Sequence, residues 1–195
     1  MKKILLILFL ALAFISPINS QIYISPTGND NTGDGTITRP WRTFTMAWNN
    51  VTAGGTIYVR GGIYTYSMVG QVRLANKSGT AENPIKVWNY PGETPIIDFL
   101  DYPNTSAASI MRIENVSYLH MRGIRCRHLL QPTSGSITHV GIRIAQNVNN
   151  CVFMQCTADH IGGWGFVVYG GSNTPNTASS NNIFWNCDSH HISDR

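Results

Sequence analysis

The sequence contains 195 residues, carries a formal net charge of +4, and has charged side chains at only 12% of its positions. Two of the lysines lie at the extreme amino terminus, so the remainder carries +2 (4 − 2), which is too little to indicate a nucleic-acid-binding protein. Turn-forming residues are abundant, with 18 glycines, and β-branched residues are frequent. This composition favours an all-β protein with short turns.

The first residues have the pattern of an export signal. Lys2 and Lys3 precede an apolar run over residues 4–15, and the small residue Ser20 ends a plausible cleavage site. This pattern is typical of a secretory signal peptide over residues 1–20, and the run is too short to span a bilayer comfortably. The mature protein is therefore expected to be secreted or periplasmic, with no membrane segment after signal removal.

The next segment, residues 21–66, is expected to form an N-terminal cap and the first coil of a repetitive fold. A helix is predicted over residues 43–50, because Thr43 can cap its first turn. Its apolar side chains recur on one face at helical spacing, at Phe44, Ala47 and Trp48. Such a helix suits a cap that covers the open end of a solenoid. Short strands are expected at Ile22–Ser25, Thr56–Arg60, Ile63–Tyr66, Ile85–Asn89 and Ile96–Phe99.

Residues 67–195 contain a repeat. Three histidines, His128, His160 and His191, are separated by 32 and 31 positions. A second column with the same two intervals contains Ile124, Cys156 and Cys187. Each repeat holds only short strands with alternating apolar positions, with glycine or asparagine at the corners. A period of this length indicates a solenoid, and strands without helices favour a right-handed parallel β-helix.

The last repeat breaks off at Arg195 without an amphipathic closing segment. An uncovered β-helix end exposes core side chains and strand edges. We therefore expect the chain to be truncated at its carboxyl end. A complete short protein that caps itself by dimerising is the alternative.

Two arginines, Arg112 and Arg143, occupy the same position of adjacent repeats, and each lies between apolar residues that point inward. Alternation places both on one outer face, one coil or roughly 4.8 Å apart. Stacked like charges need anions between them. Two explanations stay open: binding of an acidic glycan, or pairing with Glu114 or Asp159. Trp164, in a glycine-rich segment, is the best candidate for an exposed ring that stacks on a sugar.

The cysteines and the histidine column have structural explanations. The four cysteines show no spacing typical of a zinc site. Cys156 and Cys187 stack in adjacent coils, where a ladder of reduced core thiols is favoured over a disulfide. The histidines are either a metal-binding ladder or, the favoured interpretation, stacked corner residues that hydrogen-bond to the backbone.

Several segments resemble known proteins. Tyr23–Asp30, Arg39–Phe44 and Gly55–Tyr64 resemble the opening of secreted bacterial β-helix proteins, a likeness that is specific for the architecture and not for the activity. The segment Asn186–His191, with the sequence Asn-Cys-Asp-Ser-His-His, is similar to the family-9 polysaccharide lyases, a pectate lyase group. Together these segments imply a pectate lyase-like solenoid with a short N-terminal capping helix.

The resemblance also implies a chemistry. Such lyases cleave polygalacturonate by β-elimination: calcium held by aspartates binds the uronate carboxylate, a lysine or arginine removes the proton on C5, and the C4–O4 bond breaks. The motif position makes Asp188 one calcium ligand. No lysine follows Lys86, so the expected base lies beyond Arg195, and this span alone is expected to be inactive.

The predicted function is a calcium-dependent polysaccharide lyase for acidic polysaccharide, with Asp188 as metal ligand and with Arg112, Arg143 and Trp164 as substrate-binding residues. The full-length enzyme is expected to be a monomer that binds no nucleic acid. Two alternatives stay open. One is a non-catalytic surface or carbohydrate-binding β-helix protein. The other is a β-helix glycoside hydrolase, for which Asp159 and Asp188 offer the carboxylates.

Overall fold

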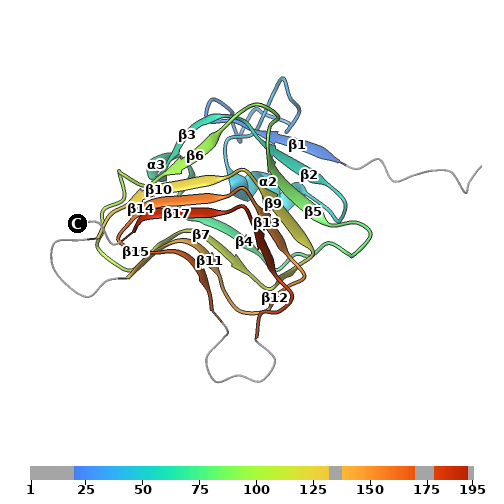
Figure 1. Cartoon of the computed structure of the whole chain (residues 1–195). Coiled ribbons are helices and arrows are strands. Elements are labelled where there is room, and N and C mark those ends of the chain that lie inside the picture. Colours follow the sequence, from blue (N-terminus) through green and yellow to red (C-terminus); the bar gives the residue numbers. More distant parts are fainter. Residues whose placement is uncertain (1–19, 132–137, 170–177, 193–195) are drawn as a thin grey trace, which may run out of the picture.

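The computed structural model describes residues 20–131, 138–169 and 178–192, and the predicted signal peptide, apart from its last residue, lies outside them. In the described part every strand pairing is parallel, and the chain winds through successive coils that stack along one axis (Figure 1). The predicted right-handed parallel β-helix is therefore confirmed. Across these residues, no helix is both long and apolar enough to cross a membrane.

Three parallel sheets form the faces of the coils, and neighbouring strands in a sheet come from successive coils. Sheet A contains β1 (Gln21–Ile24), β2 (Thr56–Val59), β5 (Ile85–Asn89), β9 (Leu119–Arg122), β13 (Val152–Met154) and β16 (Ile183–Trp185). Sheet B contains β3 (Gly62–Thr65), β6 (Pro95–Asp98), β10 (Arg125–Leu129), β14 (Thr157–Ile161) and β17 (Asp188–Ile192). Sheet C contains β4 (Val72–Ala75), β7 (Ser109–Glu114), β11 (His139–Ile144) and β15 (Gly163–Val168). The two-residue strands β8 (Val116–Ser117) and β12 (Val148–Asn149) pair between sheets C and A.

The predicted N-terminal helix is present as α2 (Phe44–Asn50). The Thr43 hydroxyl accepts the backbone N–H of Met46 at 3.2 Å, as an N-cap should. The carboxylate of Asp30, from the preceding loop, accepts the N–H groups of Arg42 and Thr43 and so fixes the start of the helix. The helix packs against β1 and β4, the first strands of sheets A and C, and its buried side chains are Phe44, Ala47 and Trp48.

A second short helix, α3 (Tyr66–Val69), was not expected from the sequence. Its first N–H groups, on Tyr66 and Ser67, donate to the carboxylate of Asp101 from the next coil. The helix therefore depends on a contact between residues 34 or 35 positions apart, which local sequence does not reveal.

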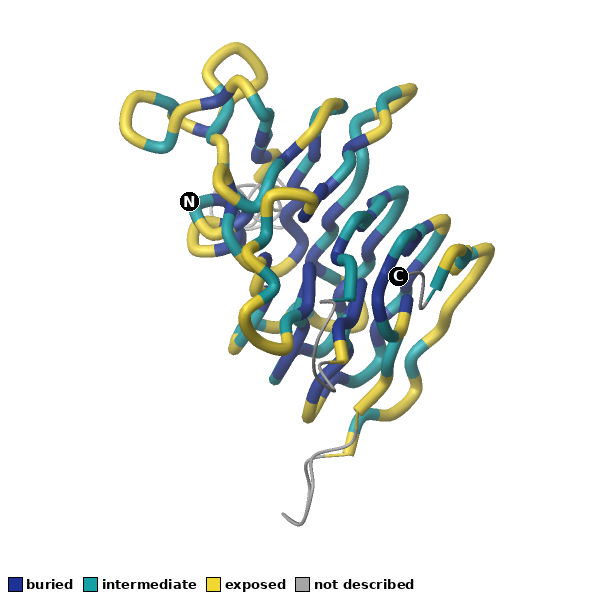
Figure 2. The backbone as a smooth tube through the Cα atoms, turned by 90° about the vertical axis from the view of Figure 1, so that its left-hand side faces the viewer, coloured by how far each residue is buried: buried dark blue, intermediate teal, exposed yellow. Residues whose placement is uncertain are grey.

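The core is built from columns of inward-facing side chains, one from each coil. In sheet B one such column runs through Tyr64, Ile97, Cys126 and Ala158, all of which are fully buried. Figure 2 shows that buried residues recur from coil to coil along the stack, whereas the last described coil is mostly exposed. Complete burial of a large apolar side chain contributes about 1.5–3 kcal/mol, so each coil adds its own increment to the free energy of unfolding.

The bends between the sheets use residues that tolerate a left-handed backbone. The histidine column lies one residue before the ends of β10, β14 and β17 in sheet B, with φ of 60° at His128, 53° at His160 and 49° at His191. Asparagine, the side chain that best tolerates this region after glycine, supplies many of the other positions. These are Asn76, Asn104, Asn115, Asn147, Asn150, Asn181 and Asn186.

The coils differ in length although their register is continuous. Arg73, Arg112 and Arg143 occupy the same position of successive coils in sheet C, yet they are separated by 39 residues (73 to 112) and then by 31 (112 to 143). The eight additional residues therefore fall in the turns and not in the strands.

Candidate functional site

The predicted metal ligand lies on the outer face of sheet B. Arg125, Thr157 and Asp188 are aligned in β10, β14 and β17, as the repeats predict. The Asp188 side chain is 69% exposed, which agrees with the expectation that it faces solvent. Its carboxylate lies 3.1 Å from Nδ1 of His190. The Asp188 carboxylate is thus largely accessible to a ligand on the outer face of sheet B.

A cleft of about 470 Å³ surrounds this position, and we call it the Asp188 cleft. It runs across the corner between sheets A and B, and so it brings together side chains from four coils. Its lining residues are Asn89, Glu93, Thr94, Gly123, Ile124, Arg125, Gln155, Thr157, Asp188 and His190.

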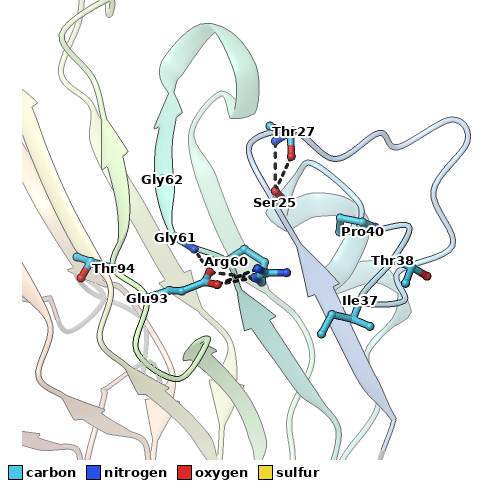
Figure 3. Close-up of a pocket in the computed structure, with 10 residues that line it drawn as sticks. All are labelled: Ser25, Thr27, Ile37, Thr38, Pro40, Arg60, Gly61, Gly62, Glu93 and Thr94. Carbon is cyan, nitrogen blue, oxygen red and sulfur yellow. Dashed lines mark hydrogen bonds and ion pairs between the residues drawn. The ribbon is translucent and has the colours of Figure 1, made fainter.

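A second cleft, of about 570 Å³, continues toward the N-terminal loop (Figure 3). The two clefts share Glu93 and Thr94. In this second cleft Arg60 and Glu93 point toward one another, and two guanidinium nitrogens of Arg60 lie 2.8–3.0 Å from the Glu93 carboxylate (Figure 3). Hydrogen bonds from Arg60 lower the pKa of Glu93, which stays ionised at neutral pH. The ion pair fixes the wall between the two clefts.

The charged side chains beneath the Asp188 cleft are already paired. Nε and Nη2 of Arg125 donate to the two carboxylate oxygens of Asp159 at 2.7 and 2.9 Å. Burial alone would raise the pKa of Asp159, but the hydrogen bonds from Arg125 and His160 outweigh it and lower the pKa to about 2. The hydrogen bond to Asp159 also raises the pKa of Arg125. Arg125 is therefore held as a cation at neutral pH, which does not suit a base, and Asp159 is ionised at neutral pH, which does not suit a general acid.

The histidines form a column as expected: the rings of His160 and His191 stack with centroids 4.6 Å apart, and those of His128 and His160 meet edge to face with centroids 5.2 Å apart. The expected bonds to the backbone were wrong for two of them. Nδ1 of His128 contacts the Asp98 carboxylate at 3.1 Å, and Nδ1 of His160 contacts the Asp159 carboxylate at 2.8 Å. Buried aspartates are available to both, Asp98 from the adjacent coil and Asp159 from the preceding position, and they are stronger acceptors than carbonyl oxygens.

The described residues do not by themselves fit a calcium site. Calcium takes six to eight oxygen ligands, and several of these must be carboxylates or carbonyls that converge. Within residues 20–131, 138–169 and 178–192, no group of three histidine, cysteine or acidic side chains could hold a metal ion. Asp188 stands in the cleft without a second free carboxylate beside it.

The three predicted substrate-binding residues lie together on sheet C, on a different face from Asp188. Arg112 is on β7, Arg143 on β11 and Trp164 on β15, and Arg112 aligns with Arg143 as predicted. Trp164 aligns with Val140 and is 54% exposed. Sheet C therefore carries the predicted glycan-binding side chains, and sheet B carries the predicted metal ligand.

The two arginines differ in their partners, so pairing with an acid explains Arg112 but not Arg143. Nε of Arg112 donates to the Glu114 carboxylate at 2.6 Å, so this arginine has the structural partner that was one of the alternatives. Asp159, the other acid considered, pairs with Arg125 instead. Arg143 packs against the ring of Tyr169, with its guanidinium carbon 5.2 Å from the ring centroid.

A third arginine of this column escaped the sequence analysis. Arg73 aligns with Arg112, and its guanidinium also binds Glu114. The segment Val72-Arg73-Leu74 has the same alternation as the segments around Arg112 and Arg143, and this signal could have revealed it. The interval of 39 residues, in place of 31 or 32, concealed it.

All four cysteines are free in the structure, as the favoured interpretation expects. A hydrogen bond between the thiols raises the pKa of Cys156 and lowers that of Cys187. Cys187 directly precedes Asp188, but its side chain packs against the hydrophobic core. These two thiols therefore pack beneath the cleft and do not line it.

Parallel coils, an N-terminal helix and an exposed aspartate in a polar cleft define a pectate lyase-like right-handed β-helix. The sequence matches, over residues 22–195, the family described as Pel9A-like, right handed beta helix region, and the chain belongs to this family. The pectate lyase PEL9 of Emericella nidulans is 40% identical over 105 residues, which are 54% of this chain and 25% of PEL9. The chain thus spans a quarter of the length of this curated relative.

Two solved structures share the fold. A rhamnogalacturonan lyase superposes with a TM-score of 0.65 at 19% identity, over 88% of this chain and 51% of the other. A GH136 lacto-N-biosidase from Eubacterium ramulus superposes with a TM-score of 0.67 at 14% identity, over 87% of this chain and 34% of the other. At such identities the likeness concerns the fold alone, and a fold does not determine the chemistry.

Proposed function

We propose that this protein is an exported polysaccharide lyase that cleaves polygalacturonate-type acidic glycans by β-elimination, with the Asp188 cleft as its binding groove. The observation that carries the proposal is the exposed carboxylate of Asp188 in a cleft on sheet B, in a chain of this family. The relative named as a pectate lyase supports the same substrate class. The monomeric state and the absence of nucleic-acid binding are part of the same proposal.

We further propose a calcium requirement, with Asp188 supplying one ligand. The remaining ligands would have to come from outside the described residues, because no second free carboxylate lies in the cleft. Calcium, when bound, would neutralise the uronate carboxylate and so make the adjacent C5 proton more acidic.

The base is likewise assigned to residues outside the described cleft. Lys77 donates to the carbonyl oxygens of Trp48, Asn49 and Val51 and thereby caps the end of α2. Lys86 lies on sheet A beside the ring of Trp88. Neither lysine lines the Asp188 cleft, and Arg125 is held as a cation.

The glycoside hydrolase alternative has weaker support from the geometry. It needs one carboxyl group that can give up a proton and a second that is ionised. Asp159 is fully buried and stays ionised because Arg125 and His160 bind it, so it does not suit the role of proton donor.

The test is a lyase assay on the protein expressed from its complete reading frame, with polygalacturonate as substrate. We expect ultraviolet-absorbing unsaturated uronides to appear, to vanish with a calcium chelator, and to return when calcium is restored. We expect Asp188→Asn to lower the rate by about 100-fold, because a metal ligand is lost. Asp34→Asn, which changes an exposed aspartate paired with Arg39, is the matched control and should leave the rate unchanged.

Two other outcomes would contradict the proposal. New reducing ends without unsaturated products would indicate a hydrolase. Binding of the glycan without any cleavage would indicate the carbohydrate-binding alternative.

A further inference from the structure

The outer face of sheet C carries a column of three arginines in consecutive coils. Arg73, Arg112 and Arg143 are aligned on β4, β7 and β11. Adjacent strands are about 4.8 Å apart, so the three guanidinium groups belong to neighbouring positions of one stack. Like charges placed directly opposite destabilise a sheet unless anions lie between them. Whether this column can bind a further anion therefore depends on how many of its arginines are already paired with carboxylates of the protein.

One carboxylate serves the first two arginines. Glu114 has a side chain that is only 4% exposed, and it binds both Arg73 and Arg112. Burial alone would raise the pKa of Glu114, but hydrogen bonds from both arginines lower it, so the carboxylate is ionised. Three cations and one anion leave this part of the face with a net charge of +2 (3 − 1).

The third arginine, Arg143, has no carboxylate partner in the described part of the chain. Where one coil has Glu114 after Ile113, the next has Ala145 after Ile144, in the same register. Among the described residues no acidic side chain pairs with Arg143, and its Nε–H is buried without a hydrogen-bond acceptor. The ring of Tyr169 packs 5.2 Å from its guanidinium carbon and helps to hold the group in place. The buried Nε–H itself is out of reach of a ligand, so an incoming anion would meet the outer Nη groups of this half-buried, positioned side chain.

We propose that Arg143, together with the adjacent Arg112, forms a carboxylate-binding site on the outer face of sheet C for a uronate group of an acidic glycan. A guanidinium group presents paired N–H donors that match the two oxygens of a carboxylate. The choice of a uronate rests on the proposed function, whose polymeric substrate carries a carboxylate on each sugar. The site lies on a different sheet from the Asp188 cleft, and so its binding of a uronate can be measured separately from cleavage.

The site is tested by the binding of a fluorescent oligogalacturonate to the whole protein in the presence of a calcium chelator. Arg143→Gln should weaken binding about tenfold or more, as expected when a charge-assisted pair is lost. Arg39→Gln removes an exposed arginine from the N-terminal loop and is the matched control, which should bind like the wild type. Arg143→Lys keeps the charge without the paired donors, so it should bind with intermediate affinity.

Folding is checked by near-ultraviolet circular dichroism, and the Arg143→Lys variant keeps the test valid if Arg143→Gln does not fold. Wild-type affinity in both Arg143 variants would overturn the proposal. Equal, Arg143-dependent binding of a single-stranded DNA of similar length would overturn the assignment to uronate.

The outcome is independent of the Asp188 proposal. Asp188→Asn should lower calcium-dependent cleavage about 100-fold, whereas Arg143→Gln should weaken the calcium-free binding about tenfold or more. Loss of cleavage in Asp188→Asn with normal binding in Arg143→Gln would overturn only the sheet C site. Weak binding in Arg143→Gln with full cleavage in Asp188→Asn would overturn only the assignment of Asp188.

Discussion

The outer faces of sheets B and C carry similar cations on the same scaffold, but they neutralise them differently. On sheet B acids recur in alternate coils of one column, Asp98, Arg127 and Asp159, so that Arg127 binds Asp98 and Arg125 binds Asp159. On sheet C three arginines are aligned, and the carboxylate of Glu114 binds two of them, Arg73 and Arg112. Sheet B is therefore internally balanced beneath its cleft, whereas sheet C retains an excess of positive charge. A face on which acids recur along the column neutralises its own arginines. A face with one acid for three arginines can still take up an anion.

The largest effect is expected where the balance of sheet B is broken. Asp159→Asn removes a carboxylate with no solvent exposure and leaves the guanidinium of Arg125, which is 34% exposed, without its partner. We expect a loss of about 3 kcal/mol in the free energy of unfolding at pH 7, measured with urea. The control Asp34→Asn breaks an ion pair whose side chains are 62% and 44% exposed, and it should cost less than about 0.5 kcal/mol. Equal losses in the two variants would show that the Asp159 pair contributes no more than a surface pair.

The carboxylate of Asp159 should also make the free energy of unfolding depend on pH in the acid range. The pKa of Asp159 is 3.8 in an ordinary environment and about 2 in the folded protein, so the ionised carboxylate stabilises the folded state. This contribution of about 2 kcal/mol is fully present above about pH 4 and is lost as the pH falls toward 2. Urea midpoints measured from pH 5 to pH 2 should therefore decline more steeply in the wild type than in Asp159→Asn. Parallel declines would contradict the assignment.

A smaller effect is expected when sheet C loses its only carboxylate. Glu114→Gln leaves Arg73, Arg112 and Arg143 stacked without an anion, and we expect a loss of about 1–2 kcal/mol at low salt, because two of these arginines are 59% and 37% exposed. Salt should restore part of the stability, since the screening length falls to about 3 Å at 1 M. Adding Arg143→Gln to this variant should also restore stability. A loss that ignores both salt and Arg143 would mean that Glu114 acts through packing alone.

Local signals in the sequence were sufficient for the helix and the repeat. Thr43 and the apolar face behind it predict α2, because capping and helical spacing act within one turn. The interval between Arg112 and Arg143 predicts their register, because equal intervals place residues on the same position of adjacent coils. The exposed position of Asp188 follows from the same alignment.

Features that depend on turns or on contacts across coils were not predictable in the same way. Arg73 was missed because its coil is longer, and the bond of His128 to Asp98 depends on which side chains meet once the coils stack. The second cleft forms between the N-terminal loop and Glu93, two segments far apart in sequence. Such contacts are fixed by packing in three dimensions, and no periodic pattern encodes them.

The unequal coil lengths suggest how this scaffold can change. Eight additional residues between Arg73 and Arg112 leave the alignment of these two arginines intact, so the length of a turn is almost independent of the stacking beside it. Insertion or exchange of turn segments could therefore remodel the rim of a groove while the rungs beneath it keep their order. In this architecture diversification can proceed by lengthening and shortening the edges, and a protein engineer could graft a recognition loop at the same places.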